Sequence, residues 1–270
     1  MRLLMCPPLY YGIKYEINPE SNFWMSRSRQ SDPQTAQGQW RNLYRLLEDE
    51  LDLDIATVEP RPGLPDMVFT ANAGLVWKRK FITSYFRYEV RRGESPHFEN
   101  WFQVRGYDIF QLPSENFFEG EGDLLTCGDL CFGGYHIRTD IVSHRKVAEM
   151  IEHEILSLEL TNDWFYHLDT CFCPLGKGRA LYYPPAFDAH ALKVLENNME
   201  TLIPVAEEEA RRFACNAIVV EKNVVMNDGC PQIRDQLISL GFSVFETPLS
   251  EFIKAGGGAK CLVLKVPHAD

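Results

Sequence analysis

Residues 256–266 read GGGAKCLVLKV, so three glycines and a cysteine stand close before an apolar, β-branched run. The glycines let the backbone pass close to a ligand or take a positive φ, and the run predicts a buried strand. Cys261 therefore lies where a flexible loop enters a sheet, a suitable position for a nucleophile. Taken alone, a cysteine before an apolar strand is more often a core residue, so the rest of the chain has to decide.

A related pattern recurs four times upstream. In each copy a short motif of polar or small residues precedes an apolar strand, a turn, a second strand, usually a helix, and a further strand. The motifs occupy residues 65–74, 118–123, 166–170 and 215–217, and helices are expected at 140–153, 188–198 and 231–240. The marker residues lie 51, 46, 47 and 45 residues apart along the chain; they are Asn72, Asp123, Asp169, Asn216 and Cys261.

This spacing predicts the fold, because a repeat of roughly 20 to 50 residues is typical of solenoid and propeller architectures. We expect an α/β protein, a five-bladed α/β propeller with pseudo-fivefold ββαβ repeats, formed by residues 1–270 as one domain. The fifth copy lacks a strand, which we expect the N-terminal run at residues 2–6 to supply. In such a propeller the first strand of each unit ends at the axis, so the five motifs converge on one pocket.

The N-terminal segment follows a different pattern. Residues 9–35 are irregular, polar and aromatic, and we expect them to form a loop over the site. Residues 36–51 carry apolar side chains at helical spacing and predict an amphipathic helix. A short strand is expected at residues 55–58.

Composition narrows the classes of function. The chain has 270 residues, of which 45% are hydrophobic and 24% charged, and its formal net charge is −11. The net negative charge argues against a nucleic-acid partner, because phosphate neutralisation needs clustered Lys and Arg, and it fits a cationic small-molecule substrate. Neither an apolar run near 18 residues nor a secretory signal is present, so we expect no membrane partner and a cytoplasmic location.

Eight cysteines without an export signal favour reduced thiols over a disulfide framework. The pairs Cys127/Cys131 and Cys171/Cys173 are spaced loosely like metal ligands. However, Cys171 and Cys173 alternate within an expected strand and lack the two-residue knuckle that is common in zinc sites. We therefore expect no zinc at these cysteines.

If the motifs converge, they bring together the groups needed for covalent catalysis at a cationic, planar carbon. These groups are Cys261, His167, the carboxylates of Glu119, Asp123 and Asp169, and the amides of Asn72 and Asn216. Cysteine attacks as a thiolate, which a neighbouring imidazolium or bound cation stabilises. Carboxylates match the fork of N–H donors on a guanidinium, and a histidine can protonate a departing amine and then activate water.

Each of these residues also has a plainer interpretation. His167 stands among aromatic residues, where a histidine is usually hydrogen-bonded within the core. Glu119 and Asp123 flank glycines, a setting typical of turns, and Arg138 could pair with a surface acid. The shared register of the motifs favours function, because independent turns would not fall in phase.

At these residues the chain resembles the guanidine-modifying enzymes of the pentein, or amidinotransferase, superfamily. The similar stretches span the chain: PDMVFTANAG (65–74), FFEGEGD (117–123), GGYHIRTD (133–140), HLDT (167–170) and GGGAKC (256–261). The resemblance implies a five-bladed α/β propeller without a cofactor. It also implies a role for each of five residues: Cys261 as nucleophile, His167 as general acid and base, Glu119 as its partner, Asp169 as guanidinium ligand and Arg138 as ligand of the substrate carboxylate.

Two departures bear on the substrate. Where arginine deiminases carry an aspartate, this chain has Asn72, as in the arginine dihydrolase branch, and an amide can bind the ureido oxygen of citrulline that an aspartate would repel. The stretch 119–123 has one residue more than the commoner EGGD, which leaves open whether Glu119 or Glu121 faces the pocket; we prefer Glu119, because it follows an apolar pair. The opening MCPPLYYGIKYEINP (5–19) also resembles the dihydrolase branch, which implies that Asn18 lies on a loop over the site.

We therefore expect a hydrolase of non-peptide C–N bonds in linear amidines, an arginine dihydrolase that gives ornithine, CO2 and ammonia. Asn72, Asp123, Arg138, Asp169 and Asn18 are the expected substrate-binding residues. The alternatives are a dimethylarginine dimethylaminohydrolase, an arginine deiminase, an amidino transferase, or a non-catalytic binding or regulatory propeller. The expected partner is a small guanidino compound. A homo-oligomer and a further ornithine-processing domain, which dihydrolases can carry, stay open.

Overall fold

Five three-stranded sheets form the framework of the part of the chain that the computed structural model describes, residues 1–15 and 30–267. The strands fall into five groups in sheet order: β15 (Leu264–Val266), β1 (Arg2–Met5) and β2 (Asp54–Thr57); β3 (Gly74–Trp77), β4 (Lys80–Thr83) and β5 (Asp108–Gln111); β6 (Leu124–Cys127), β7 (Leu130–Tyr135) and β8 (Leu156–Glu159); β9 (Phe172–Gly176), β10 (Arg179–Tyr182) and β11 (Thr201–Pro204); β12 (Ile218–Val220), β13 (Asn223–Asn227) and β14 (Ser243–Thr247).

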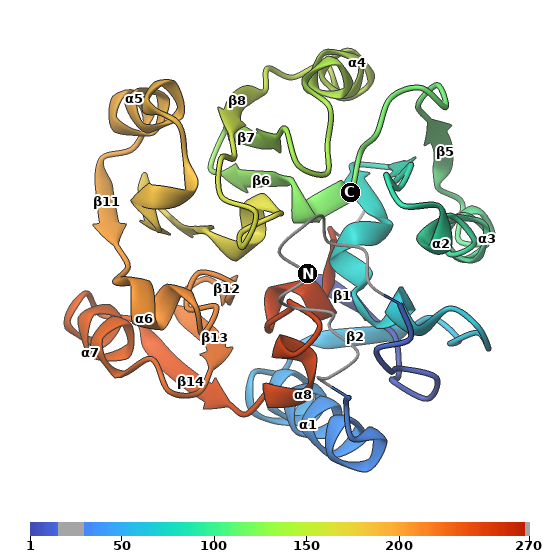
Figure 1. Cartoon of the computed structure of the whole chain (residues 1–270), viewed down its shortest axis with the longest axis horizontal. Helices are drawn as coiled ribbons and strands as arrows, with labels where there is room; N and C mark the ends of the chain where they lie inside the picture. Colours follow the sequence, from blue (N-terminus) through green and yellow to red (C-terminus); the bar gives the residue numbers. More distant parts are fainter. Residues whose placement is uncertain (16–29, 268–270) are drawn as a thin grey trace.

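All five sheets share one internal arrangement. The middle strand pairs antiparallel with one neighbour and parallel with the other. A parallel pair needs a crossover connection, and a helix supplies it in every sheet. These helices are α1 (Pro33–Arg45), α3 (Ser95–Gln103), α4 (Ile141–Ile151), α5 (Ala189–Asn198) and α7 (Pro231–Ser239). Figure 1 shows the sheets around a common centre, with the crossover helices at the periphery.

The prediction that the N-terminal run supplies the strand missing from the fifth repeat is confirmed. Strand β1 lies between β15 and β2, antiparallel to the first and parallel to the second, so the N-terminal run completes the sheet of the cysteine loop. The expected strand at 55–58 lies one residue earlier, at Asp54–Thr57. Helices expected at 140–153, 188–198 and 231–240 are found within two residues of those limits.

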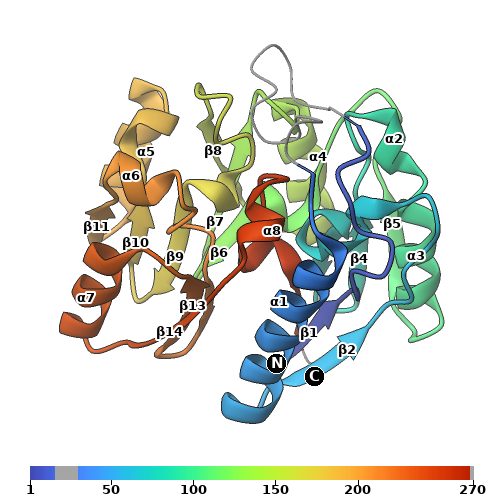
Figure 2. The ribbon, with the colours of Figure 1, turned by 60° about the horizontal axis from the view of Figure 1, so that its bottom comes forward.

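The helix expected at 36–51 differs most from the structure. It begins at Pro33, where the side chain of Asp32 accepts a hydrogen bond from the Thr35 amide, and it ends as a π-helical turn over Leu46–Glu50. An aspartate cap followed by proline is a strong start signal that precedes the first apolar position of the pattern. Residues 33–35 of the loop expected at 9–35 thus belong to this helix, and residues 16–29 lie outside the described ranges. Short helices α2 (Glu89–Arg92), α6 (Glu207–Ala210) and α8 (Ser250–Ile253) complete the set; Figure 2 shows α8 towards the middle of the molecule, near α1.

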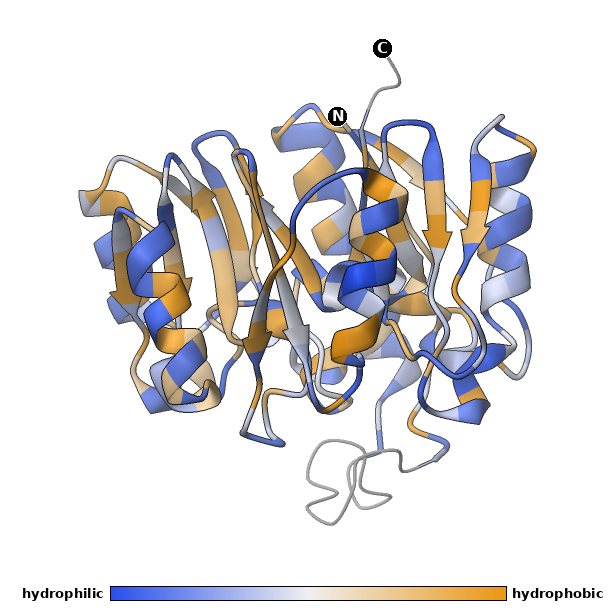
Figure 3. Cartoon of the chain, turned by 90° about the horizontal axis from the view of Figure 1, so that it is seen from above, coloured by the Kyte–Doolittle hydropathy of each residue, from blue (hydrophilic) through white to orange (hydrophobic). Residues whose placement is uncertain are grey.

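Large apolar side chains pack the helices against the strands. Figure 3 shows mostly apolar strands and helices with polar stretches. Phe81 on β4 is fully buried and stacks on Phe102 of α3, with 3.9 Å between the ring centroids. Truncating such a phenylalanine costs about 3–5 kcal/mol, so this packing fixes the sheet against its helix.

The marker motifs form tight turns just before the first strand of each sheet. Four are 3-10 turns: η3 (Thr70–Ala73), η4 (Gly120–Gly122), η5 (Leu168–Thr170) and η7 (Lys260–Leu262). Turn η3 contacts both η4 and η7, and η4 contacts η5. Gly120 has φ +58°, and a Cβ there would lie 2.5 Å from the carbonyl oxygen of Gly74. Neighbouring turns thus meet backbone to backbone, which brings their side chains within reach of one another.

No helix in the described ranges is long and apolar enough to cross a membrane. Over the same residues, no group of three or more His, Cys, Asp or Glu side chains is placed to hold a metal ion.

Candidate active site

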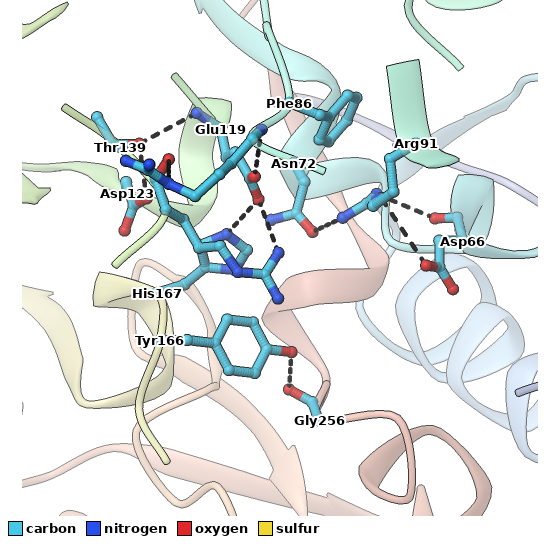
Figure 4. Close-up of polar contacts among 12 residues, drawn as sticks. Asp66, Asn72, Phe86, Arg91, Glu119, Asp123, Thr139, Tyr166, His167 and Gly256 are labelled. Atoms are coloured by element: carbon cyan, nitrogen blue, oxygen red, sulfur yellow. Dashed lines mark hydrogen bonds and ion pairs between the residues drawn. The ribbon is translucent and has the colours of Figure 1, made fainter. Parts of the chain in front are cut away.

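Glu119 links the expected acid–base histidine to the expected carboxylate-binding arginine. Its Oε2 lies 2.7 Å from Nε2 of His167 and 3.2 Å from Nη1 of Arg138, and all three side chains are buried (Figure 4). The backbone amide of Arg87 donates to the other oxygen, Oε1, at 3.2 Å. Burial opposes ionisation, yet the Arg138 charge and the His167 hydrogen bond lower the pKa of Glu119 to about 2. Glu119 is therefore an anion at neutral pH.

Arg138 is held between two aromatic rings. Its guanidinium lies 4.7 Å from the ring centroid of Tyr88 and 4.5 Å from that of Tyr166. The Tyr166 hydroxyl donates to the carbonyl of Gly256, in the loop before the cysteine, at 2.8 Å. A stacked, planar guanidinium keeps its N–H donors in the plane of the fork, which suits it to binding a carboxylate.

Asp123 stands on the far side of the histidine segment. Its Oδ2 accepts from the Thr139 hydroxyl at 2.7 Å, and its Oδ1 accepts from the Leu168 amide at 3.0 Å. Thr139 in turn accepts from the Glu119 amide at 3.1 Å. Burial raises the pKa of Asp123 to about 6, against the opposing influence of His167. Asp123 thus braces the backbone on which the histidine sits.

Cys261 lies on η7 with 2% of its surface exposed, and its sulfur is 3.4 Å from Oδ2 of Asp169. Burial, and after it the charge of Asp169, raises the pKa of the Cys261 thiol well above its usual value. Burial likewise raises the pKa of Asp169 to about 7. The other oxygen of Asp169, Oδ1, is buried and has no hydrogen-bond partner within the described ranges. Without a bound cation the Cys261 thiol is therefore neutral. A cation that binds here would stabilise both the Cys261 thiolate and the Asp169 carboxylate.

Asn72 is oriented by a buried ion pair. Nη1 of Arg91 donates to its Oδ1 at 2.9 Å (Figure 4). Glu94 holds Arg91 through two further bonds of 2.9 Å. Nδ2 of Asn72 is buried and has no partner among the residues described. A Cβ on Gly122 would lie 2.4 Å from that nitrogen and 3.3 Å from Nδ1 of His167. The amide donor and the histidine thus border the same space.

The two acids that the sequence left open lie in different surroundings. Glu121 is bonded to Nζ of Lys260 at 2.9 Å and to the backbone amide of Lys265 at 3.3 Å, whereas Glu119 contacts His167. The preferred acid, Glu119, is therefore the one at the histidine. The Glu121 carboxylate is thus engaged in a buried ion pair with Lys260 and is not hydrogen-bonded to the histidine.

Turns from all five sheets supply the expected site residues that the structure describes. The groups connected by hydrogen bonds are Glu119 with His167 and Arg138, and Cys261 with Asp169 and Asn216; Asp123 and Asn72 adjoin the histidine. Asn18 lies outside the described residues.

Sequence reasoning did not single out several contributors. These are Arg91, Glu94, Thr139, Tyr166 and Lys260. Thr139 and Lys260 adjoin residues that the motifs did single out, and Arg91 had no signal beyond being an arginine near one motif.

A family model for eukaryotic N,N dimethylarginine dimethylhydrolase matches residues 9–267, nearly the whole chain. The chain belongs to the dimethylarginine dimethylhydrolase family. This agrees with the resemblance drawn from the motifs. Among curated relatives, the bifunctional arginine dihydrolase/ornithine cyclodeaminase AgrE of Nostoc sp. is 44% identical over 271 residues, covering 98% of this chain and 38% of AgrE. The chain thus spans less than half the length of that relative.

Two further members of the wider dimethylarginine dimethylhydrolase family are similar along most of their own length. The dimethylarginine dimethylaminohydrolase of Mycobacterium tuberculosis is 37% identical, with 98% of this chain and 85% of that protein covered. The crystal structure of a variant of the N-terminal domain of ArgZ, covalently bound to a reaction intermediate, superposes with a TM-score of 0.92. It is 43% identical and covers 97% of this chain and 96% of that domain.

Proposed function

We propose that this chain is a cysteine-dependent arginine dihydrolase, which converts arginine and two waters into ornithine, CO2 and two ammonia. The observation that carries the proposal is that residues 167–169 bring His167 against Glu119 and Asp169 against Cys261, with all four side chains buried. The 44% identity to AgrE and the covalent intermediate in the ArgZ domain support it.

The first round follows from the charges in the pocket. In this proposal the guanidinium of arginine enters against Asp169 and Glu119, which accept its N–H groups, and its positive charge lets the Cys261 thiol lose its proton to solvent. The thiolate attacks the guanidinium carbon and forms a C–S bond. Nδ1 of His167 protonates one nitrogen, which leaves as ammonia, and a thiouronium adduct remains.

Water then closes the round. His167, now neutral, takes a proton from the water that attacks the adduct carbon, and the sulfur leaves as thiolate with the electron pair of the C–S bond. The product of this step is citrulline. In the second round the Cys261 thiolate attacks the ureido carbon, His167 protonates the nitrogen that leaves as ammonia, and a thiocarbamate remains. Water then displaces the thiolate, and the resulting carbamate of ornithine loses CO2.

Asn72 favours the second round. Because Arg91 occupies Oδ1, the amide presents Nδ2 as a donor to the pocket, and a donor there can bind the ureido oxygen of citrulline. An aspartate at this position would place a second oxygen against that group. We propose that this donor retains citrulline for its second hydrolysis.

The remaining substrate contacts are part of the same proposal. Arg138, stacked between two tyrosines, binds the substrate carboxylate, and Asn18 contributes from the segment outside the described residues. Asp123 keeps a lone pair on each oxygen besides those used by Thr139 and Leu168, so it can also accept from the guanidinium.

The same proposal covers the organisation of the protein. Residues 1–270 form one guanidine-modifying domain whose five sheets close into a propeller, and a small guanidino molecule is its binding partner. A cytoplasmic location suits it, because the nucleophile must stay reduced and all eight cysteines, which lie in the described ranges, are free. Light scattering measures whether the protein forms a homo-oligomer.

Incubation with arginine, followed by mass spectrometry, tests this function. Ornithine should accumulate with two ammonia for each arginine consumed, and Cys261→Ser should abolish turnover. Citrulline as the only stable product would overturn the dihydrolase assignment, and undiminished activity of Cys261→Ser would overturn the mechanism.

A second candidate is dimethylarginine hydrolysis, which the family model and the M. tuberculosis relative favour. It predicts release of dimethylamine from asymmetric dimethylarginine at a higher kcat/KM than ammonia from arginine. The two substrates compared in one assay decide between the candidates.

A further inference from the structure

Asn216 is the one marker residue of the repeat to which the proposed function gives no role. It lies directly before β12, in the turn that precedes the first strand of its sheet, and it is fully buried. Its amide makes four hydrogen bonds, which join the turns of three different sheets. Nδ2 donates to the Asp169 carbonyl at 3.0 Å and contacts the Cys261 sulfur at 3.2 Å, while Oδ1 accepts from the amides of Gly258 at 3.0 Å and Cys261 at 3.1 Å.

These contacts leave the amide only one orientation. Both groups at Oδ1 are backbone N–H donors, so a flipped amide would place its NH2 against two donors. The NH2 must therefore face the sulfur and the Asp169 carbonyl. Gly258 makes this possible, because a Cβ at that position would lie 2.9 Å from Oδ1 of Asn216.

A fixed N–H donor aimed at a sulfur has a chemical consequence. The thiol lies in a buried site next to Asp169, and both conditions disfavour the thiolate. A hydrogen bond donated to the sulfur stabilises the anion more than the neutral thiol, so it opposes this bias. The same amide also holds the backbone N–H of Cys261 and thereby fixes the direction of its side chain.

We propose that Asn216 is a catalytic residue of this site, whose Nδ2 stabilises the Cys261 thiolate before attack and again when the sulfur leaves. This inference rests on the proposed function only in taking Cys261 as the nucleophile. It is independent of which guanidino compound is the substrate. The amide that joins the turns of three sheets thus also donates a hydrogen bond to the nucleophile.

The test removes the Nδ2 donor of Asn216 and keeps the oxygen that accepts from the backbone amides of Gly258 and Cys261. In Asn216→Asp, one carboxylate oxygen can still accept from Gly258 and Cys261, while the other oxygen faces the sulfur and repels a thiolate. Alkylation of Cys261 by iodoacetamide, followed by peptide mass spectrometry across a range of pH, reports the thiolate. We expect its apparent pKa to rise by at least one unit, and kcat to fall by about 10²- to 10³-fold with KM for arginine nearly unchanged.

Asn227 provides a matched control. It is also a buried amide of the same sheet, with Oδ1 accepting from the Leu249 amide and Nδ2 donating to the carbonyls of Arg212 and Asp228. Asn227→Asp makes the same chemical change away from the sulfur. It should lower the melting temperature and leave the pH profile of alkylation unchanged.

A milder variant covers the case in which Asn216→Asp does not fold. Gly258→Ala retains Asn216 and presses its Cβ against Oδ1, so the amide must shift by a few tenths of an ångström and the apparent thiolate pKa should rise by a smaller amount. A thiolate profile equal to that of the unmodified chain in whichever variant folds would overturn the proposal. Because alkylation needs no substrate, this result stays distinct from a failure to release ornithine.

Discussion

Oε2 of Glu119 accepts a hydrogen bond from Nε2 of His167 over 2.7 Å, and this contact determines which histidine nitrogen is available for chemistry. Since Glu119 is ionised, Nε2 must carry a proton, and Nδ1 is the nitrogen that can exchange one. Nδ1 borders the space left by Gly122, which Nδ2 of Asn72 also borders. Nδ1 of His167 and the amide nitrogen of Asn72 therefore border one small volume.

Glu119→Gln should reduce kcat by about 10²- to 10⁴-fold, because the neutral amide no longer favours the imidazolium that protonates the departing nitrogen. Steady-state kinetics with arginine measure this loss. An unchanged kcat would remove Glu119 from the mechanism.

Gly122→Ala should inactivate the enzyme while leaving the fold intact. The added Cβ would lie 2.4 Å from Nδ2 of Asn72, so the amide must move out of the space it shares with His167. We expect kcat to fall at least about 100-fold, as for loss of one aimed donor, with an unchanged circular dichroism spectrum. Gly128→Ala is a suitable control, because a Cβ there meets no atom within 4 Å, although its φ of +61° carries some strain. Equal activity of both variants would contradict the prediction.

Asn72→Asp should change the product from ornithine to citrulline. Arg91 can still donate to one carboxylate oxygen, so the side chain keeps its orientation and the second oxygen repels the ureido oxygen of citrulline. Ornithine formation should fall by about 10²- to 10³-fold while citrulline accumulates, which quantitative mass spectrometry measures. Asn100→Asp, on the exposed face of α3, controls for the added charge. Ornithine released at the original rate would show that the amide donor is not needed.

Glu121→Gln should mainly affect stability. It leaves Lys260, which is 5% exposed, as a buried cation without its partner, and breaking such a pair costs about 3–5 kcal/mol in free energy of unfolding. Urea unfolding measures this loss. The double variant with Lys260→Met should recover part of it, because no unpaired charge is then buried. Exposed Glu115→Gln should leave the unfolding free energy within about 0.5 kcal/mol, and a similar result for Glu121→Gln would contradict the prediction.

The unliganded protein should become less stable as the pH rises from about 4 to 7. Burial raises the pKa of Asp169 to about 7 and that of Asp123 to about 6, so the folded state binds more protons than the unfolded state in this window. Each group contributes a slope of up to about 1.4 kcal/mol per pH unit. Glu119, with its pKa lowered to about 2, acts oppositely and only below about pH 4.5, where its stabilisation is lost on acidification.

Urea unfolding at pH 5 and pH 7 checks this dependence. Asp169→Asn should flatten the profile, whereas exposed Asp108→Asn should not. Saturating arginine should also flatten it, because the cation favours the ionised carboxylates. A stability that rises from pH 5 to pH 7 in the unliganded protein would contradict the assignment.

The repeat made the sheets predictable from sequence, because each unit carries its own apolar strands and turns within about fifty residues. The pairing of β1 with β15 also followed, since one unit lacked a strand. The choice between Glu119 and Glu121 needed coordinates: Gly120 between them takes φ +58°, and this left-handed turn sends the two side chains to different partners. Arg91 was missed for a related reason. Its hydrogen bond to Asn72 joins two segments, and the local sequence does not specify where their side chains point.

The pairing of β1 with β15 has a consequence for how the protein is made. Arg2 lies opposite Val266, so the strand behind the nucleophile finds its partner only after almost the whole described chain has left the ribosome. Contacts between such distant positions form late, because the intervening chain must first be ordered. The sheet beside Cys261 is therefore expected to form after the four other sheets, whose strands lie within about fifty residues of one another.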